Sequence, residues 1–473
     1  MKIKSLSNSV AWYGMGNLFI RSVSFILLPL YSNLISTAEF GNYALLMSVY
    51  TIASVIYQLG MHGSLNKFYI EAKTEERKKL IFSSIINSIL LFGIVVTIFL
   101  SLFSDWLSVL IFETSEFSSL LVLIFVSLLF ETLTFYILFL LKTKELSKKV
   151  VAYSGIGAII NLCLNILFVY YLRLSVAGII LAQLISAAIL LLVMLNVIKD
   201  EYVLKLDQKI FKNVIKFSLP LVAAGILSSA VDVADRFILN YYLGKDEVGI
   251  YSFAYRIAMV MNVFVISFRT AWSPYSLNLF YSRDYKSSFG KTLTKMVALS
   301  GVILLVVSLF GDYLFDIKFL QVSMFNQAYK AGMVILPLVI IGYIFSGISS
   351  FYSVYPYISN KSYHFLYADL LSFLINVALN FILIPWLGII GAAFATAIGF
   401  LVGAAYLFFI SRDQIKIDYQ TKKLTVIIMT SLMLLLIGLN LKNIFLDLSL
   451  VIIYMGILQY LVKLDLTKLL KRT

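Results

Sequence analysis

Apolar segments of about 20 residues recur along almost the whole chain, separated by short polar segments. A helix of this length crosses the hydrocarbon core of a bilayer. The apolar runs are continuous rather than alternating, which favours helices over the strands of a barrel. Since backbone groups in hydrocarbon must hydrogen-bond one another, we expect an all-α integral membrane protein. The pattern predicts fourteen spans, at residues 11–35, 43–66, 80–103, 117–141, 150–171, 175–198, 217–241, 249–272, 296–316, 331–355, 364–385, 388–410, 424–441 and 448–463.

Two internal matches indicate a repeat of six helices. The segment EFGNYA at 39–44 matches EVGIYS at 247–252, and Asn161-x3-Asn165 matches Asn376-x3-Asn380. Because six is even, both copies have the same orientation, and we expect two bundles related by a pseudo-two-fold axis along the membrane normal. The predicted organisation is an N-terminal six-helix bundle (1–205), a C-terminal six-helix bundle (206–415) and two additional C-terminal helices (416–473).

The composition agrees with a membrane protein. Apolar residues make up 61% of the 473 residues and charged residues only 13%, and the mean hydropathy is +0.95. A soluble protein carries roughly 25% charged residues, so the composition excludes a soluble multi-domain enzyme. The net charge is +14. A nucleic-acid-binding protein needs a soluble basic face, and this chain has almost none, so we expect no nucleic-acid partner.

The positive charge follows the predicted topology. If both termini lie inside, 29 of the 38 Lys and Arg residues fall in inner segments, five in outer loops and four within spans. This bias predicts an orientation with both termini in the cytoplasm. No extramembrane segment exceeds about 20 residues and no phosphate-binding loop of the GxxxxGK[ST] kind occurs, so we expect neither an enzyme nor an ATP-driven pump.

Cysteine and histidine are scarce. Cys163 is the single cysteine, and His62 and His364 are far apart in the sequence. We therefore expect no disulfide, no metal site and no cofactor. The basic start of the chain precedes a long apolar stretch without a small-residue cleavage site, so we interpret it as a retained first helix and not as a signal peptide.

Eight charged residues fall inside the predicted spans. Each costs several kcal/mol, roughly 2.5–3.5 on insertion scales, and such residues usually face a cavity. One interpretation is a cationic cavity between the bundles, in which guanidinium groups bind a phosphate or another anion and carboxylates carry a coupling proton or cation. The alternative is that these residues pair with one another and hold helices together, as the i,i+4 spacing of Asp232 and Arg236 suggests. Arg269 and Asp369 lie near the cytoplasmic ends of their spans and can reach the interface.

The candidate residues form two groups. The substrate-binding candidates are Arg21, Arg236, Arg256 and Arg269. The ion-coupling or charge-pair candidates are Asp232, Asp235, Glu131 and Asp369. We predict no catalytic residue.

Several short motifs occur in a characteristic order: LYSNLIS at 30–36, EFGxY at 39–43, Asp235-Arg236, VGIYSxAYR at 248–256 and Trp272-Ser273-Pro274, followed by the second asparagine pair. In these motifs the chain resembles the polysaccharide-repeat-unit flippases, O-antigen flippases included, of the multidrug/oligosaccharidyl-lipid/polysaccharide exporter superfamily. The resemblance covers nearly the whole chain. One departure is that the charge within the spans is balanced and not strongly cationic.

The resemblance implies a transporter of the bacterial inner membrane that works by alternating access. Its substrate would be an undecaprenyl-pyrophosphate-linked oligosaccharide, turned from the cytoplasmic to the periplasmic leaflet. A proton or sodium gradient would supply the energy. Membrane lipids would be partners, together with a polysaccharide polymerase and chain-length proteins.

Three other functions remain open at this point. A multidrug and toxin exporter of the same superfamily should have twelve helices and an acid-rich cavity, which the fourteen spans and the arginines within them disfavour. A lipid II flippase shares the helix count. A membrane-embedded glycan polymerase or ligase would need a large periplasmic loop, whereas the predicted external loops have about 5–20 residues.

The cavity interpretation predicts that Arg21→Ala and Arg256→Ala each reduce export at equal protein level. A hydrogen bond to a charged group contributes about 1.5–3 kcal/mol, so we expect a loss of roughly ten-fold or more. Undiminished export in both variants would rule out a cavity role for these arginines.

Overall fold

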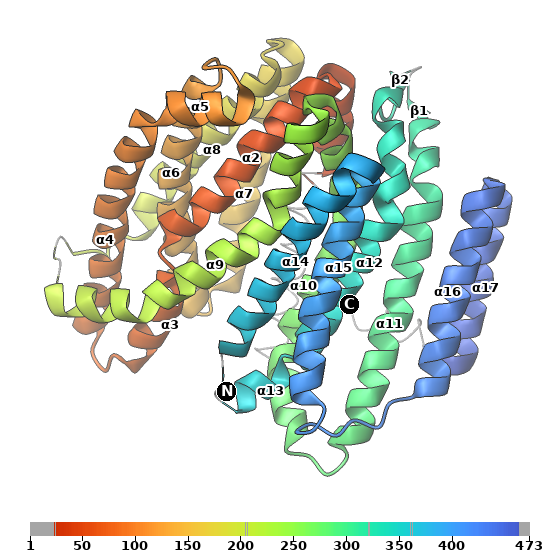
Figure 1. Ribbon diagram of the computed structural model, residues 1–473. Coiled ribbons are helices and arrows are strands. Elements are labelled where there is room, and N and C mark those ends of the chain that lie inside the picture. Colours follow the sequence, from red (N-terminus) through yellow and green to blue (C-terminus); the bar gives the residue numbers. More distant parts are fainter. Residues whose placement is uncertain are drawn as a thin grey trace. The chain divides into compact units, whose positions relative to one another are not determined.

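The computed structural model describes residues 23, 25–203, 205, 207–319, 322–359, 361 and 363–462 (Figure 1). Within these residues the chain is almost entirely helical, with one short antiparallel pair of two-residue strands. The chain divides into two compact units, Met1–Val233 and Ala234–Thr473, and the division falls inside one long helix. The domain limits predicted at residues 205 and 415 stay predictions.

The first unit contains a ten-residue apolar helix at Phe25–Leu34, followed by seven numbered α-helices and the first part of an eighth. The numbered elements are α2 (Thr37–Gln58), α3 (Met61–Glu71), α4 (Glu75–Leu102), α5 (Ser104–Phe112), α6 (Ser118–Thr143), α7 (Ser147–Asn165), the π-helix η1 (Ile166–Tyr171), α8 (Ser175–Val197) and α9 (Gln208–Leu243).

The second unit contains the end of α9 and all later elements. These are α10 (Lys245–Phe280), α11 (Tyr285–Phe310), η2 (Asp312–Phe315), β1 (Lys318–Phe319), β2 (Val322–Ser323), η3 (Gln327–Ile335), α12 (Leu336–Tyr352), α13 (Val354–Ile358), α14 (Tyr363–Leu387), α15 (Ile389–Ser411), α16 (Thr421–Leu441) and α17 (Ile444–Val462).

Twelve helical segments among the described residues are long and apolar enough to cross a membrane. They coincide with twelve of the fourteen predicted spans, which confirms an all-α, multi-pass membrane protein. The predicted span at 11–35 lies mostly outside the described residues. The predicted span at 217–241 lies within α9, which is not one of the twelve segments. The count of fourteen is therefore not confirmed.

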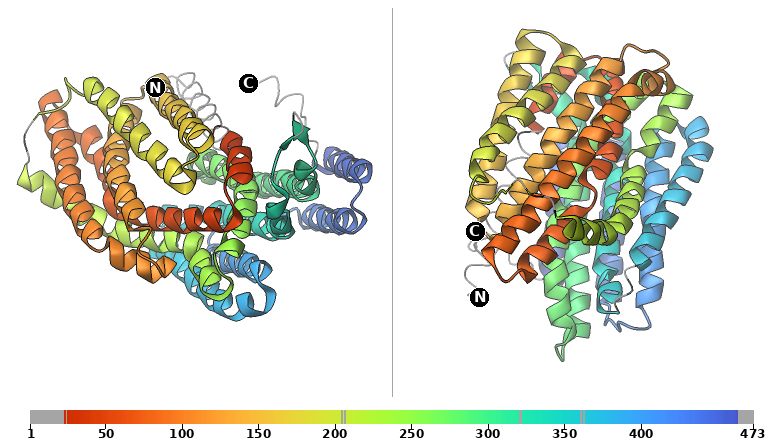
Figure 2. Two further views of the ribbon diagram at one scale, coloured as in Figure 1. Left: turned by 90° about the horizontal axis from the view of Figure 1, so that it is seen from above. Right: turned by 90° about the vertical axis from the view of Figure 1, so that its left-hand side faces the viewer.

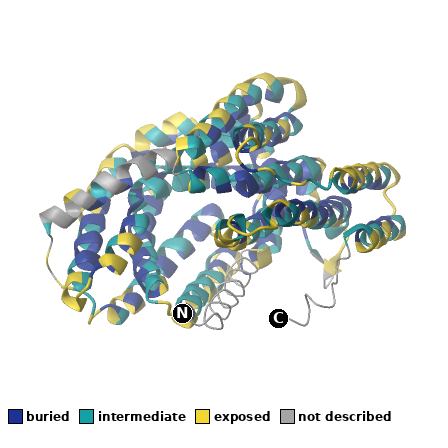
Figure 3. Cartoon of the chain, turned by 90° about the horizontal axis from the view of Figure 1, so that it is seen from below, coloured by how far each residue is buried: buried dark blue, intermediate teal, exposed yellow. Residues whose placement is uncertain are grey.

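Helix α6 is central to the first unit, where it packs against α2, α3, α4, α5, α7 and α8. Its inward side chains include Phe125, Leu128 and Tyr136, which are at most 1% exposed. Many helices are buried on one side and exposed on the other (Figure 3). The exposed side chains are often large and apolar, as Leu192 on α8 is at 64% exposure. A surface of this kind is stable in contact with lipid and unstable in contact with water, because the transfer of apolar area from water into hydrocarbon is favourable.

The start of α2 explains part of the EFGxY motif. Ser36 caps the helix by accepting a hydrogen bond from the Glu39 amide, and the Glu39 carboxylate accepts from the Ser36 amide. This reciprocal pair satisfies two backbone donors at the helix start. The same carboxylate accepts a hydrogen bond of 2.7 Å from Ser175, which ties the start of α2 to the start of α8.

The second unit is built on α10, α12, α14 and α15, with α11 packed against α10 and α12. The C-terminal helices α16 and α17 lie beside α11 (Figure 2). Gly301 of α11 permits this approach, because a Cβ atom there would lie 2.0 Å from the hydroxyl of the buried Tyr454 on α17. An aromatic cluster around Trp272 and Phe351, whose rings stack at 4.7 Å, joins α10 to α12.

The segment between α15 and α16 is held against the start of α11. The Asp418 amide donates to the Lys286 carbonyl at 3.3 Å, and the Tyr419 hydroxyl lies 3.0 Å from that of Tyr352. Gly290 lies directly beneath this segment, where a Cβ atom would approach the Asp418 carbonyl oxygen to 2.0 Å. A side chain at position 290 therefore forces the backbone to move.

We predict that Gly290→Ala lowers the free energy of unfolding by about 1–3 kcal/mol, the usual cost of overpacking. Gly456→Ala on α17 is the matched control, because a Cβ there meets nothing within 4 Å. Both substitutions gain the helix propensity of alanine, so their difference isolates the clash. Thermal unfolding in detergent measures it, and equal unfolding temperatures for the two variants would contradict the packing described here.

Candidate functional site

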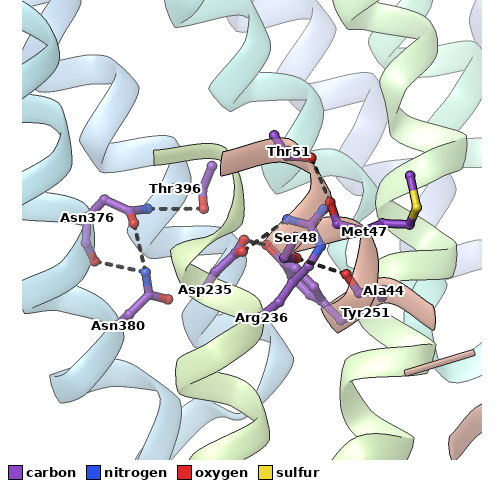
Figure 4. Close-up of polar contacts among 10 residues, drawn as sticks. All are labelled: Ala44, Met47, Ser48, Thr51, Asp235, Arg236, Tyr251, Asn376, Asn380 and Thr396. Atoms are coloured by element: carbon purple, nitrogen blue, oxygen red, sulfur yellow. Dashed lines mark hydrogen bonds and ion pairs between the residues drawn. The ribbon is translucent and has the colours of Figure 1, made fainter. Parts of the chain in front are cut away.

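Asp235, near the end of α9, is the most deeply buried of the charged candidates that the structure describes, at 0% exposure. Its Oδ1 atom lies 3.3 Å from Nη1 of Arg236, and its Oδ2 atom accepts a hydrogen bond from the Tyr251 hydroxyl of α10 (Figure 4). A buried carboxylate requires such partners, because an unpaired charge is very costly in a low-dielectric interior. The contacts hold Asp235 as a paired carboxylate between α9 and α10.

A second set of polar contacts lies on α14 and α15 (Figure 4). Tyr251 lies within hydrogen-bonding reach of Thr396, and the Thr396 hydroxyl accepts from Asn376 Nδ2 at 3.2 Å. Asn380 Nδ2 donates to the carbonyl and side-chain oxygens of Asn376 at 2.9 and 3.0 Å. Tyr251 and these three residues of α14 and α15 are each at most 1% exposed. One buried network therefore connects Asp235 with the asparagine pair that the sequence repeat contains.

One atom of this network lacks a partner. The side-chain oxygen of Asn380 is buried and accepts no hydrogen bond from the part of the chain that the structure describes. An unsatisfied buried acceptor costs about 1–3 kcal/mol, and each such group in a structure requires an explanation. Amide, hydroxyl and carboxylate oxygens are the ligands that hard cations prefer. The open oxygen can therefore serve as one ligand of a small cation.

The first unit contains the corresponding asparagine pair in a closed form. Asn165 Nδ2 donates to the carbonyl and side-chain oxygens of Asn161 at 2.8 and 3.0 Å, as in the second unit. Asn161 in turn donates to Ser186 at 3.2 Å. The side-chain oxygen of Asn165, however, accepts a hydrogen bond of 2.8 Å from Tyr31. The same motif is thus sealed by a tyrosine in one unit and open in the other.

Arg236 also contacts an aromatic surface. Its guanidinium lies 4.9 Å from the ring centroid of Tyr255, and Tyr255 packs edge to face on Tyr343 at 5.9 Å. A guanidinium over an aromatic ring gains a favourable cation–π interaction. The side chain of Arg236 keeps 13% exposure, so it lies at the edge of the buried network.

The other predicted residues are distributed over both units. Glu131, on α6 of the first unit, is bound by three neutral donors. In the second unit, Arg269 donates to Ser350 at 2.9 Å and interacts electrostatically with Asp369. Arg256 is half-buried on α10.

Asp232 and Arg21 are the remaining predicted residues. Asp232 is exposed on α9 and, like Arg256, takes part in interactions of its own. Arg21 lies outside the described residues. Of the eight candidates, the structure thus joins Asp235 with Arg236 in an ion pair.

One expectation needs correction. The sequence spacing gave Asp235 no partner on its own helix, whereas Arg236 forms an ion pair with its neighbour Asp235. Adjacent residues do not face one another on a helix, but the arginine side chain is long enough to turn back. The predicted pairing of Asp232 with Arg236 stays a prediction. Sequence reasoning also missed Tyr251 and Thr396 as site residues. Tyr251 did carry a signal, because it stands in the repeat match EVGIYS and in the motif VGIYSxAYR, whereas a lone threonine such as Thr396 gives none.

Two further observations concern other possible ligand sites. Among the described residues, no group of three His, Cys, Asp or Glu side chains is placed to hold a metal ion. A pocket of about 510 Å³ opens at the turn between α3 and α4, where Phe68, Lys73 and Arg77 help to line it. It contains none of the predicted site residues.

The fold is that of a known class of membrane transporters. The structure is similar to that of the lipid II flippase MurJ in an inward closed conformation, with a TM-score of 0.76 and 18% identity over 94% of this chain and 98% of that one. It is similar to an inward-facing multidrug resistance MATE family transporter of the MOP superfamily, with a TM-score of 0.71 and 14% identity over 87% and 96%.

A third similar structure is a MOP superfamily transporter from Pyrococcus furiosus, with a TM-score of 0.64 and 17% identity over 86% of this chain and 95% of that one. These identities are low, so the three likenesses establish the fold alone. The protein is a multi-pass membrane protein with the fold of MOP superfamily transporters.

The sequence comparisons give the family. The profile of the family described as Polysaccharide biosynthesis protein matches residues 6–280, and the chain belongs to this family. A curated relative from Shigella flexneri, named "Putative O-antigen transporter", is 25% identical over 250 residues, which cover 51% of this chain and 57% of the relative. The match thus spans little more than half the length of that relative.

The ion pair predicts a coupling free energy between Asp235 and Arg236. Breaking a buried pair by removing one partner costs about 3–5 kcal/mol, because a charge is left without its counter-charge. We expect Asp235→Asn and Arg236→Gln each to lower the unfolding temperature, and the double variant to lose less than the sum. Thermal unfolding in detergent measures all four forms.

The control pair is Lys330 and Asp316, which also lie 3.3 Å apart but are 37% and 59% exposed. An exposed pair contributes about 0–1 kcal/mol, so its double-mutant cycle should be nearly additive. Additive losses at Asp235 and Arg236 would contradict a stabilising pair.

Proposed function

We propose that the protein is a flippase that moves an undecaprenyl-pyrophosphate-linked oligosaccharide, an O-antigen or other polysaccharide repeat unit, across the bacterial cytoplasmic membrane. The observation that carries this proposal is the family match over residues 6–280. The name of the Shigella flexneri relative supports the substrate class. Proteins with similar folds include a lipid II flippase, and lipid II flippase activity is likewise the movement of a lipid-linked substrate across a membrane.

The buried network supports coupling to an ion gradient. In the described geometry the carboxylate of Asp235 neutralises Arg236, so the guanidinium is not free for an anionic substrate. A cation bound at Asp235 and the open oxygen of Asn380 would compete for the carboxylate. Arg236 could then bind the pyrophosphate, whose geometry the guanidinium fork matches. Cation binding and substrate binding would thereby become linked through alternating access.

The remaining parts of the proposal follow from the sequence. Both termini lie in the cytoplasm, since 29 of the 38 cationic side chains fall on that side in the predicted topology. The protein acts as a transporter and not as an enzyme. Its partners are membrane lipids, the lipid-linked glycan, a coupling proton or sodium ion, and the polymerase and chain-length proteins of polysaccharide assembly.

A second candidate is a lipid II flippase. The observation in its favour is the TM-score of 0.76 to the structure of that name. A multidrug exporter has less support, because the arginines at positions 236 and 256 do not suit a cationic drug. The glycan polymerase or ligase is disfavoured by the short predicted external loops.

The test is deletion of the gene from its own host. We expect loss of surface polysaccharide and a several-fold accumulation of undecaprenyl-pyrophosphate-linked repeat units, measured by mass spectrometry of extracted lipids. The wild-type gene should restore both, and Asp235→Asn should not. Accumulation of lipid II in place of the repeat unit would replace this proposal with the second candidate.

The cation site predicts opposite effects of two substitutions at one position. Asn380→Asp adds a carboxylate and should lower the ion concentration that gives half-maximal transport, whereas Asn380→Ala removes the ligand oxygen and should raise it, each by roughly ten-fold. Transport of lipid-linked glycan into proteoliposomes under imposed sodium or proton gradients measures the shift. Equal half-maximal concentrations in both variants and the wild type would exclude Asn380 as an ion ligand.

A further inference from the structure

The first unit contains a second ionisable centre within a span, at the half-buried Glu131 in the middle of α6. Its Oε1 atom accepts hydrogen bonds from Ser127, one turn earlier, at 2.9 Å and from Gln183 Nε2 of α8 at 3.0 Å. Its Oε2 atom accepts from the Tyr50 hydroxyl of α2. Three helix segments that are far apart in the sequence thus direct one donor each at a single carboxylate, and all three donors are neutral.

No counter-charge accompanies this carboxylate. Among the described residues, Glu131 forms no ion pair with Lys, Arg or His. Helix α8 contains no charged residue. His62 of α3 packs against Phe135 and Phe139, one and two turns further along α6. Glu131 is therefore in a different electrostatic setting from Asp235, which has an adjacent arginine.

Two tyrosines on the helices of this unit are engaged elsewhere, and the charged residues of these helices do not bond to Glu131. Tyr57 bonds to Thr97, and Tyr136 bonds to the Gln58 carbonyl. The charged residues on these helices are Glu39 on α2, Lys67 and Glu71 on α3, Glu75, Glu76, Arg77, Lys78 and Lys79 on α4, Asp105 on α5, Lys142 on α6 itself, and Lys148 and Lys149 on α7. None of them contacts Glu131.

The arrangement supports two protonation states. Three hydrogen bonds stabilise the ionised form, while the lack of a counter-charge among the described residues favours the neutral acid. When a proton binds Oε2, the carboxylate becomes a carboxylic acid and the net charge of the centre changes from −1 to 0. The Tyr50 hydroxyl then only has to rotate so that its oxygen accepts the new O–H. A metal ion would require all three donors to turn away, so the geometry suits a proton.

We propose that Glu131 takes up and releases one proton during transport and that Tyr50, Ser127 and Gln183 are the residues that position it. The proposal rests on the proposed function and deepens it: each unit would have its own ionic centre, with a proton in the first and a cation in the second. The Asn161–Asn165 pair in the first unit is sealed by Tyr31, so we place the ionic centre of that unit at Glu131.

Hydrogen bonds connect Glu131 with the apolar helix Phe25–Leu34. Gln183 binds Glu131 with its side chain, and its carbonyl accepts from Ser186 at 2.9 Å. Ser186 accepts from Asn161, whose partner Asn165 binds the hydroxyl of Tyr31 on the helix Phe25–Leu34. A change in charge at Glu131 therefore acts on a hydrogen-bond chain that reaches three further helices.

The test measures protonation directly and needs no lipid-linked substrate. The full chain in lipid vesicles is titrated by infrared difference spectroscopy, which detects the C=O stretching band of a protonated carboxylic acid. We expect a band in the wild type that is absent in Glu131→Gln, a variant that keeps the side-chain shape but does not ionise. Asp447→Asn is the matched control, because Asp447 is buried and, like Glu131, bound by a tyrosine, Tyr313. It should keep the Glu131 band.

Two positioning variants separate a proton site from a merely structural carboxylate. Tyr50→Phe and Gln183→Leu each remove a donor to the ionised form, so the midpoint of the Glu131 band should move to higher pH by about one unit, equivalent to one hydrogen bond of about 1.4 kcal/mol. Glu131→Asp keeps a carboxyl group, so this variant should show a titrating band that Glu131→Gln lacks. These variants carry the test if Glu131→Gln does not reach the membrane.

The outcomes distinguish this proposal from the flippase proposal. The Glu131 band could titrate while deletion of the gene leaves the amount of lipid-linked repeat units unchanged. That combination would overturn the flippase function and keep the proton site. Identical spectra of wild type and Glu131→Gln over the pH range in which both remain folded would overturn the proton site. A midpoint that is the same in Tyr50→Phe and wild type would overturn the positioning role of Tyr50.

Discussion

Hydrocarbon offers no hydrogen-bond partner, and every level of this structure depends on that constraint. It makes the backbone helical over almost all of the described residues, so that each span satisfies its own N–H and C=O groups. It also restricts charged side chains to places where neighbouring groups replace water. Asp235 meets this requirement with a guanidinium and a tyrosine, and Glu131 meets it with three neutral donors. The pair of Asp235 and Arg236 has no net charge, whereas an ionised Glu131 with its neutral donors keeps a charge of −1.

The comparison of the two asparagine pairs shows how a repeated element acquires different roles. Both pairs have the same internal hydrogen bonds, because an i,i+4 spacing on a helix places the second amide over the first. Only the surroundings differ: Tyr31 satisfies Asn165, and the equivalent oxygen of Asn380 stays open. A single hydroxyl is enough to close such a site, so symmetry in the sequence does not require symmetry in function.

Proteins with a similar fold include a lipid II flippase and a multidrug resistance transporter. A helical scaffold of this kind fixes where side chains can converge but not which substrate they bind. In this chain the convergent groups in the second unit combine a carboxylate, an arginine and an aromatic surface. That combination suits an anionic head group more than a cationic drug, because the guanidinium is the one group near the edge of the network.

The sequence by itself determined the class of protein, the positions of twelve spans and the existence of an internal match, because hydrophobic length and helical spacing are local properties of the chain. It also identified Asp235, Arg236 and Glu131 as costly charges within spans. It gave Asp235 no partner on its own helix, since spacing along one helix does not reveal where a long side chain turns. Only the tertiary structure joined Tyr251 and Thr396 to Asp235, and Tyr50 and Gln183 to Glu131. These partners come from helices far apart in sequence, and a lone hydroxyl or amide has no pattern until packing brings it to a charge.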